Sequence, residues 1–280
     1  MLESTFQLGP GLGPSREGAL WRAGVARWEE LETAELRLPA LVRERLRAAI
    51  AEARAALEAR DVARLAELVP PREHWRLLSS FGADAAYLDI ETGDDDVAWG
   101  GISAIGLLDR HGPRLLLAER DLASFPELTR GWSMLVTFNG LAFDVPILRA
   151  AFPGWAPPPV HLDLRHLLPR LGHHGTLKHV EQELRALHLV RPAHLEGLGG
   201  WAAAGLFRRG RAGDREMLRR FAEYNLYDVI GLRTLLAYAH NRLLAGIVAR
   251  APALENVNTP LEIPGRGDVL YDVTKILLSL

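Results

Sequence analysis

The spacing of apolar residues changes along the chain from the period of a helix to that of a strand. From residue 38 to residue 68, apolar side chains recur at helical spacing, and Asp61 is placed to restart a helix after a break. Residues 72–80 suit one further short helix. We therefore expect residues 1–80 to form a small helical N-terminal region that packs on the rest of the chain.

Predicted strands and helices then alternate. Strand patterns occupy residues 85–91, 99–108, 114–119, 134–138 and 160–164. Helical patterns occupy residues 121–132, a segment that starts near Asp144, and residues 165–171, 176–187 and 214–244. The turn Asp109-Arg110-His111-Gly112 would join the second and third strands into a hairpin beside the first. This succession of elements predicts an α/β domain.

The first of these strands carries two acids, Asp89 and Glu91, inside an otherwise apolar stretch. Because side chains alternate across a strand, both acids point from one face, while Leu88 and Ile90 point into a core on the other. Two carboxylates this close repel by roughly a few kcal/mol at an effective dielectric of about 20. A raised pKa or a bound cation would relieve the pair, and hard oxygen ligands suit Mg²⁺ or Mn²⁺. The alternative is an edge strand whose acids stand in water.

Two later segments carry further candidate residues. Asp144 lies where a strand passes into a helix. There it could act as an N-terminal helix acid or reach over the strand end, where open α/β sheets hold their sites. Tyr224 and Asp228 are four residues apart and share one face of the long helix. Neither pattern identifies a site by itself.

Composition narrows the function classes. The 280 residues include no cysteine, which excludes disulfides, thiolate zinc sites and cysteine nucleophiles. The net charge of −2 argues against a non-specific nucleic-acid coat, although a local basic groove or bound metals would still serve. The chain opens without a basic and apolar signal region, and no apolar run approaches the roughly 18 residues of a membrane span. We therefore expect a soluble, cytoplasmic protein without a membrane partner.

Basic and aromatic residues suggest contacts with nucleic acid only weakly. Lysine occurs only at positions 178 and 275, so nearly every basic residue is arginine. An arginine cluster before the third candidate segment could line a phosphate entry or form a solvated helix face; it comprises Arg208, Arg209, Arg211, Arg215, Arg219 and Arg220. Four tryptophans could stack on bases, although packing is the default for each; they are Trp99, Trp132, Trp155 and Trp201.

Three other features have a structural and a functional interpretation. Gly11-Leu12-Gly13 resembles the hairpin of helix-hairpin-helix modules, whose backbone amides bind DNA phosphates, but a glycine- and proline-rich entry loop is the alternative. His173-His174 lacks a third ligand at zinc spacing. Asp163 could cap the following helix or support another acid.

Taken together, the segments resemble the DnaQ-like (DEDD) superfamily of 3′→5′ exonucleases. Asp89-Ile90-Glu91 matches the first motif of that family, an Asp-x-Glu on the first strand. Phe143-Asp144, with Asn139 upstream, matches the second motif at a strand-to-helix turn. Tyr224 and Asp228 match the third, a Tyr-x-x-x-Asp on a late helix.

The resemblance extends to a subgroup. The alternative third motif requires a histidine five residues before the Asp, where this chain has Glu223, so the chain is similar to the tyrosine subgroup (DEDDy). Thr137-Phe138-Asn139-Gly140 and Leu177-Lys178-His179-Val180-Glu181 look like the YprB-type ribonuclease H-like domains. The similarity covers roughly residues 80–240.

This resemblance implies a fold and an activity. Residues 81–245 would form an α/β ribonuclease H-like exonuclease domain, with a mixed central sheet flanked by helices, and residues 246–280 a C-terminal extension. The activity would be hydrolysis of phosphodiester bonds at the 3′ ends of single-stranded nucleic acid. DNA is slightly favoured over RNA because of the helix-hairpin-helix-like start.

It also implies a set of site residues. The implied catalytic residues are Asp89, Glu91, Asp144, Tyr224 and Asp228, of which the four acids would hold two divalent cations, Mg²⁺ or Mn²⁺. Tyr224 would orient the attacking water, because a phenol with a pKa near 10 is a poor base. Thr92 and Asn139 would contact substrate.

Three alternatives stay open. A catalytically silent nucleic-acid-binding module could share the fold, although the chain has all four acids and the tyrosine. A ribonuclease acting on RNA would have the same residues. A phosphatase with a strand-end Asp nucleophile usually has Asp-x-Asp, and Glu91 occupies the second position.

Overall fold

The computed structural model of the chain divides into two compact units. It describes residues 1–9, 11–34, 38–93, 100–187, 192–255, 260–263 and 273–280. The helical unit comprises Met1–Ala83 and Ala237–Glu262, and the sheet unit comprises Asp84–Leu236 and Ile263–Leu280. Four features of the sequence lie outside the described residues: Pro10 of the glycine- and proline-rich start, the acidic run Asp94-Asp95-Asp96, for which a solvated turn is expected, the candidate Trp99, and residues 269–272 of a C-terminal run at 269–273 that has a strand-like pattern.

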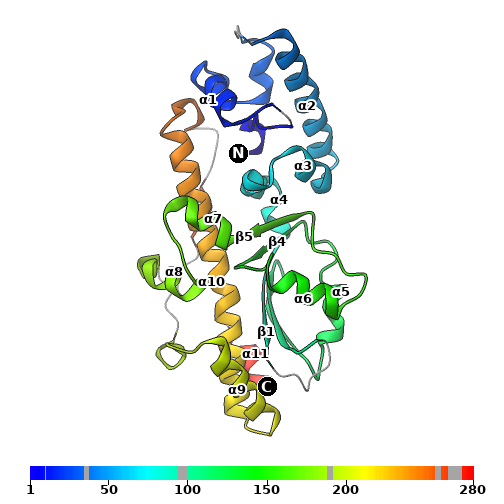
Figure 1. The fold of residues 1–280 in the computed structure, drawn as a ribbon, viewed down its shortest axis with the longest axis vertical. Coiled ribbons are helices and arrows are strands. Elements are labelled where there is room, and N and C mark those ends of the chain that lie inside the picture. The colour runs from blue at the N-terminus through cyan, green and yellow to red at the C-terminus, as the bar shows by residue number, and fades with distance from the viewer. Residues whose placement is uncertain (10, 35–37, 94–99, 188–191, 256–259, 264–272) are drawn as a thin grey trace. The chain divides into compact units, whose positions relative to one another are not determined.

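The helical unit follows the predicted pattern. Its elements are η1 (Leu2–Ser4), α1 (Pro14–Arg22), η2 (Trp28–Leu31), α2 (Ala40–Glu58), α3 (Val62–Leu68), η3 (Pro71–Leu77), α4 (Leu78–Phe81) and η9 (Pro252–Leu254), together with the C-terminal part, from Ala237, of the helix α10 (Arg215–Val248) (Figure 1). The predicted restart is confirmed, because the Asp61 carboxylate accepts the Arg64 N–H at 2.9 Å and caps α3. Arg60, in the left-handed region at φ 53°, makes the break before it.

The glycine-rich start forms a turn that leads into a single helix. Gly11 has φ +82°, and α1 begins after Gly13. The described residues before the turn contain only the three-residue 3₁₀ helix η1. A two-helix hairpin is therefore not formed by the part of this stretch that the structure describes.

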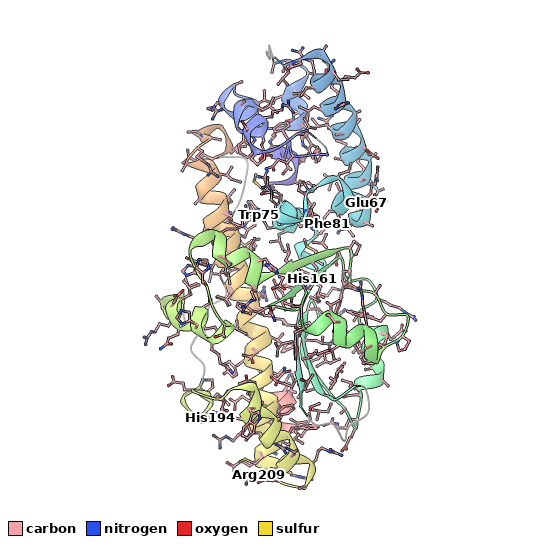
Figure 2. The ribbon with its side chains drawn as sticks, viewed as in Figure 1. Glu67, Trp75, Phe81, His161, His194 and Arg209 are labelled. Atoms are coloured by element: carbon pink, nitrogen blue, oxygen red, sulfur yellow. The ribbon has the colours of Figure 1, made fainter. Side chains whose placement is uncertain are left out.

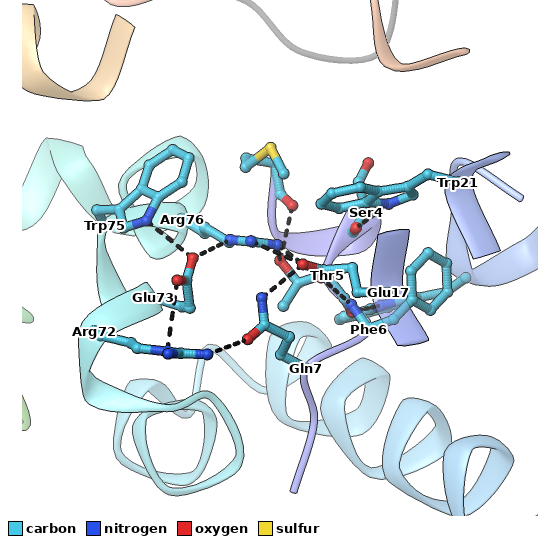
Figure 3. Close-up of polar contacts among 12 residues, drawn as sticks. Ser4, Thr5, Phe6, Gln7, Glu17, Trp21, Arg72, Glu73, Trp75 and Arg76 are labelled. Carbon is cyan, nitrogen blue, oxygen red and sulfur yellow. Dashed lines mark hydrogen bonds and ion pairs between the residues drawn. The ribbon is translucent and has the colours of Figure 1, made fainter. Parts of the chain in front are cut away.

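A buried ion network lies inside the helical unit (Figure 3). The Arg76 guanidinium donates to both oxygens of Glu17, at 2.8 and 2.9 Å, and to Glu73 at 2.8 Å. The three side chains are only 3%, 2% and 5% exposed. The guanidinium also lies over the rings of Trp21 and Trp75, 5.6 and 5.5 Å from their centroids. The positive charge is thus enclosed by carboxylates and aromatic faces.

The sheet unit contains one mixed sheet, as expected. Its strands are β1 (Ala85–Thr92), β2 (Ile102–Asp109), β3 (Gly112–Leu117), β4 (Met134–Thr137) and β5 (Val160–Asp163), in the order β3-β2-β1-β4-β5. The hairpin β2–β3 is antiparallel, and β2 is antiparallel to β1. The pairs β1–β4 and β4–β5 are parallel. The predicted hairpin and the other three strands, β1, β4 and β5, are confirmed.

Helices cover both faces of this sheet. They are η5 (Leu122–Ser124), α5 (Phe125–Leu128), α6 (Asp144–Ala151), α7 (Leu164–Leu167), η6 (Leu168–Leu171), α8 (Leu177–Glu183), η7 (Arg185–Leu187), η8 (Ala193–Leu195), α9 (Gly200–Arg211), α10 (Arg215–Val248) and α11 (Thr274–Leu278). Figure 1 shows α5 and α6 on one side of the strands and α10 on the other. The predicted helix at 121–132 was too long, because the chain leaves the helix after Leu128 and turns at Gly131 with φ +86°.

The two faces of β1 bury different neighbours. Leu88 and Ile90 pack with Leu135, Val145 and Leu148 in a core on the α6 side. Asp89 and Glu91 therefore face the α10 side, as the strand alternation predicted. Among the described residues, no helix is both long and apolar enough to span a membrane.

Candidate metal centre and active-site cleft

Three carboxylates from two distant segments converge on one point of the sheet unit. Asp89 and Glu91 come from β1, and Asp228 comes from α10. One oxygen of each lies within 4.8 Å of the others. Glu91 and Asp228 are buried, and Asp89 is half-buried. The structure therefore brings together the first and third predicted motifs.

The absence of a side chain at Gly106 lets α10 approach the sheet. Gly106 on β2 pairs with Asp89, and a Cβ at this position would lie 2.2 Å from Asn225 Oδ1 and 2.8 Å from a methyl of Val229. Any other residue would push α10, and Asp228 with it, away from β1. A glycine at position 106 is thus required for α10 to pack this closely against the sheet.

Asn225 links α10 to β1 through a hydrogen bond. Its Nδ2 donates to Asp89 Oδ2 at 3.0 Å, three residues before Asp228 on the same helix. A hydrogen bond from Asn225 also stabilises the ionised form of Glu91. Sequence reasoning missed this residue, because an asparagine inside a helix gives no signal until the strand beneath it is known.

Asp144 lies beside the three-acid cluster. It is the first residue of α6, and its Oδ1 accepts the backbone N–H of Ile90 at 3.1 Å. It is therefore held against β1 between the two strand acids. Burial raises the pKa of Asp144 to about 7, and its charge contributes to raising the pKa of Glu91.

The cluster has an excess of buried negative charge. Burial, followed by repulsion from Asp228, raises the pKa of Glu91 to about 8, while Lys178 and Asn225 oppose the rise. Neutralisation by a divalent cation would remove this cost. The donors are all carboxylate oxygens, the ligands that Mg²⁺ and Mn²⁺ prefer. The residues present therefore fit a metal centre.

Tyr224 is held by a lysine. Its hydroxyl is hydrogen-bonded to Lys178 Nζ, which also lies 4.2 Å from the centroid of its ring. Lys178 comes from α8 and donates as well to the carbonyl oxygen of Leu198. Sequence reasoning used Lys178 only as part of a family-like segment. Its rarity was an available signal, because the chain has 33 basic residues and only two are lysines.

The three clustered acids, Lys178 and Tyr224 line one cleft of about 610 Å³, whereas Asp144 and Asn225 are not among its lining residues. Residues from β1, α8, α9 and α10 contribute to its walls, and Figure 1 shows α8 and α9 beside α10. The lining includes Asp89, Glu91, Thr92, Phe138, Phe143, Lys178, Trp201, Ala204, Arg208, Tyr224 and Asp228. The predicted substrate residue Thr92 therefore lies in the same cleft as the acids.

The structure places Asn139 in the turn before α6 rather than among the residues that line the cleft. It has φ +68°, a left-handed conformation that asparagine tolerates better than most residues. Its N–H donates to Asp163 Oδ1 at 2.7 Å, and the Leu141 N–H donates to Oδ2 at 3.0 Å. Asp163 also accepts the Arg165 N–H at 3.0 Å. Asp163 thus caps α7 and holds the turn that leads to Asp144, so both of its predicted roles are combined.

Only one arginine of the predicted cluster is among the residues that line this cleft, Arg208. Arg209 pairs with Asp214 at 2.7 Å, and Arg211 pairs with Glu119 at 2.6 Å. Arg219 and Arg220 donate to the carbonyl oxygens of Leu277 and His194; Arg209 and His194 are labelled in Figure 2.

The histidines form hydrogen bonds with a glutamate. His173 and His179 contact Glu183 at 2.9 and 3.1 Å. Among the described residues, the only group with suitably close ligand atoms is the Asp89, Glu91 and Asp228 cluster. The structure therefore gives no support to zinc at His173-His174.

Of three comparisons with known proteins, one gives a match. A search of curated proteins and a search of solved structures each returned no match. A family model described as the RNase H superfamily matches residues 86–240, which include β1 except its first residue, the turn with Asp144, and Asp228. The match covers more than half of the chain and all of the sheet except Ala85. The chain therefore belongs to the RNase H superfamily.

Proposed function

We propose that the protein is a metal-dependent 3′→5′ exonuclease that hydrolyses phosphodiester bonds of single-stranded nucleic acid, either DNA or RNA. The observation that carries the proposal is the convergence of Asp89, Glu91 and Asp228 in a cleft that Tyr224 also lines. Membership of the RNase H superfamily supports nuclease chemistry with metals. The tyrosine beside the acids supports the exonuclease subgroup.

Four acids would hold two divalent cations, Mg²⁺ or Mn²⁺. Asp89, Glu91 and Asp228 provide the close oxygen cluster, and Asp144 adds a fourth carboxylate, which accepts the N–H of Ile90 between the two strand acids. When bound, the cations would lower the pKa of the attacking water and offset the charge on the leaving 3′ oxygen.

Tyr224 would position the water. Its contact with Lys178 fixes the hydroxyl in the cleft, so little motion is lost when a water is bound to it. Thr92, at the end of β1, would contact the terminal nucleotide. Asn139 would act through the turn that carries Asp144.

The test uses oligonucleotides labelled at either end, in DNA and RNA of one sequence, with Mg²⁺, Mn²⁺ or a chelator. We expect 3′→5′ shortening that requires the metal and is lost in Asp228→Asn. Glu127→Gln, which alters an exposed acid on α5, is the matched control and should retain activity.

Other outcomes identify the alternatives. Metal-independent hydrolysis, or full activity in Asp228→Asn, would contradict the mechanism. Cleavage of RNA alone would indicate a ribonuclease. Binding without hydrolysis would indicate a catalytically silent nucleic-acid-binding module.

A further inference from the structure

Trp201 stands apart from the other described candidate tryptophans. It is 92% exposed, more than any other large hydrophobic side chain that the structure describes. Trp132 and Trp155 instead pack on the ring of Phe125, with centroids 6.5 and 5.2 Å away. Trp201 lines the same cleft as the acids. An indole ring left in water beside a catalytic cleft has a large apolar face available for a ligand.

Trp201 belongs to a stripe along α9. Trp201, Ala204 and Arg208 lie at positions i, i+3 and i+7, which share one helix face, and all three line the cleft. The stripe extends about 10 Å along the helix axis. It therefore combines an exposed aromatic ring, a small residue and a cation in one row.

The stripe is positioned by the end of β1. A Cβ at Gly93, directly after β1, would lie 3.3 Å from the Cβ of Ala204. Ala204 thus packs against the strand end that carries Asp89 and Glu91. Phe143, 42% exposed, lines the cleft from the turn before α6. The cleft is accordingly lined by exposed aromatic side chains from two segments and by the acid cluster.

We propose that the α9 stripe is a binding platform for unpaired nucleotides, in which Trp201 stacks on a base and Arg208 contacts the backbone phosphate. The proposal rests on the proposed function, because it requires nucleic acid in this cleft. Aromatic stacking on bases tolerates any sequence, since every base has a π-face. Paired bases within a duplex keep their faces stacked on one another, so the platform selects single-stranded ends.

The test measures the affinity of a 5′-labelled oligonucleotide by fluorescence anisotropy, in the Asp228→Asn background so that the substrate stays intact. A second oligonucleotide has abasic sugars in its 3′-terminal segment. We expect Trp201→Ala to weaken binding of the full oligonucleotide by roughly 5- to 100-fold, and Trp201→Phe to weaken it much less. The abasic oligonucleotide should bind weakly, and equally to the parent and to Trp201→Ala.

The controls keep the result decisive. Trp201 is almost fully exposed, so its removal should not unfold the protein. Leu278→Ala removes another exposed apolar side chain of the sheet unit and should leave affinity unchanged. The platform is overturned if Trp201→Ala retains the preference for bases over abasic sugars. It is also overturned if the full oligonucleotide shows no measurable binding.

The two proposals fail in different ways. Hydrolysis that Asp228→Asn abolishes, with no effect of Trp201→Ala on binding, would leave the nuclease and reject the platform. Base-dependent binding through Trp201 without hydrolysis in the wild-type protein would leave the platform and reject the nuclease. Parallel DNA and RNA oligonucleotides show whether the sugar changes the stacking contribution.

Discussion

Two groups of buried carboxylates, one in each unit, differ in the charge that surrounds them. In the helical unit, Glu17 and Glu73 enclose the Arg76 guanidinium, and Glu17 also accepts the N–H of Phe6 at 2.8 Å. In the sheet unit, Glu91 lies beside Asp228 and has its pKa raised to about 8 by burial and by that charge. The first group is satisfied by protein donors. In the second group, the cation that lowers the pKa of Glu91 is Lys178, whose ammonium is hydrogen-bonded to Tyr224.

The difference separates carboxylates that stabilise the fold from carboxylates that are suited to bind a cation. A buried carboxylate with a guanidinium and backbone donors has its desolvation cost offset inside the fold. Like charges collected in a cleft leave part of that cost unrelieved, which a protein accepts where a ligand supplies the missing charge. Burial alone therefore does not identify a site, whereas burial combined with unbalanced charge does.

The largest expected effect comes from the sheet unit. Asp228→Asn removes a cluster carboxylate, and we expect kcat to fall by about a thousandfold or more, because metal-assisted stabilisation is worth several kcal/mol. Single-turnover hydrolysis of a 3′-end substrate measures it. Circular dichroism should show an intact fold, since the change lowers the repulsion on Glu91. A loss of folded protein instead would give Asp228 a structural role.

Substitutions in the buried ion network of the helical unit should change the stability of the protein. Arg76→Met leaves two buried carboxylates without their guanidinium, and we expect the free energy of unfolding to fall by about 3–5 kcal/mol. Denaturant unfolding followed by tryptophan fluorescence measures this. Arg47→Met breaks an exposed pair with Glu32 and should change stability by at most about 1 kcal/mol. Equal effects of the two substitutions would remove the contrast between the clusters.

Lys178 connects the acids to the tyrosine, so its removal should have an intermediate effect. In Lys178→Met we expect kcat to fall by roughly 10- to 100-fold, as for other residues that orient a metal site, with little change in KM. Because Lys178 lowers the pKa of Glu91, the acid limb of the pH–rate profile should move to higher pH. Lys178→Arg retains the positive charge, so the acid limb of its pH–rate profile should stay at the wild-type pH. An unmoved limb in Lys178→Met would contradict the electrostatic role.

The smallest effect is a pH dependence of stability in the metal-free protein. Unfolded Glu91 titrates near 4.5 and folded Glu91 near 8, so between these values the folded state binds one more proton. Stability therefore falls as pH rises, by about 1.2 kcal/mol from pH 6.5 to 7.5. Glu91→Gln should abolish this contribution.

Other groups titrate in the same range, so the measured quantity is the difference in unfolding free energy between wild type and Glu91→Gln in chelator. Glu127→Gln is the matched control. Added Mg²⁺ should stabilise the wild-type protein more than Glu91→Gln. Parallel pH profiles for wild type and Glu91→Gln would contradict the charge imbalance.

The local pattern of apolar and polar residues was sufficient to predict much of the fold. The period-2 alternation of β1 placed Asp89 and Glu91 on one face and Leu88 and Ile90 on the other, as the structure shows. The restart at Asp61 was also visible, because a cap is a short-range interaction. The helix at 121–132 was predicted too long, since apolar spacing does not reveal where Gly131 turns the chain.

The partners of the site could not be predicted in the same way. Asn225 and Asp89 are separated by 136 residues, and their contact depends on a missing side chain at Gly106. The pairing of Lys178 with Tyr224 likewise joins two helices that no sequence spacing relates. All six members of the arginine cluster are the same residue type, so the sequence could not distinguish their roles. In the structure, Arg208 is the member that lines the cleft, whereas Arg209 pairs with Asp214.

The amino-acid sequence by itself determined which residues share a strand or helix face, since backbone periodicity depends on near neighbours alone. It also supplied the acids and the tyrosine on which the expected resemblance to an exonuclease family rests. Only the tertiary structure decided that β1 and α10 bring Asp89, Glu91 and Asp228 within 4.8 Å, and that Trp201 stays exposed beside them. Convergence and exposure depend on how separate elements pack, and that packing is set by long-range steric fit such as the one at Gly106.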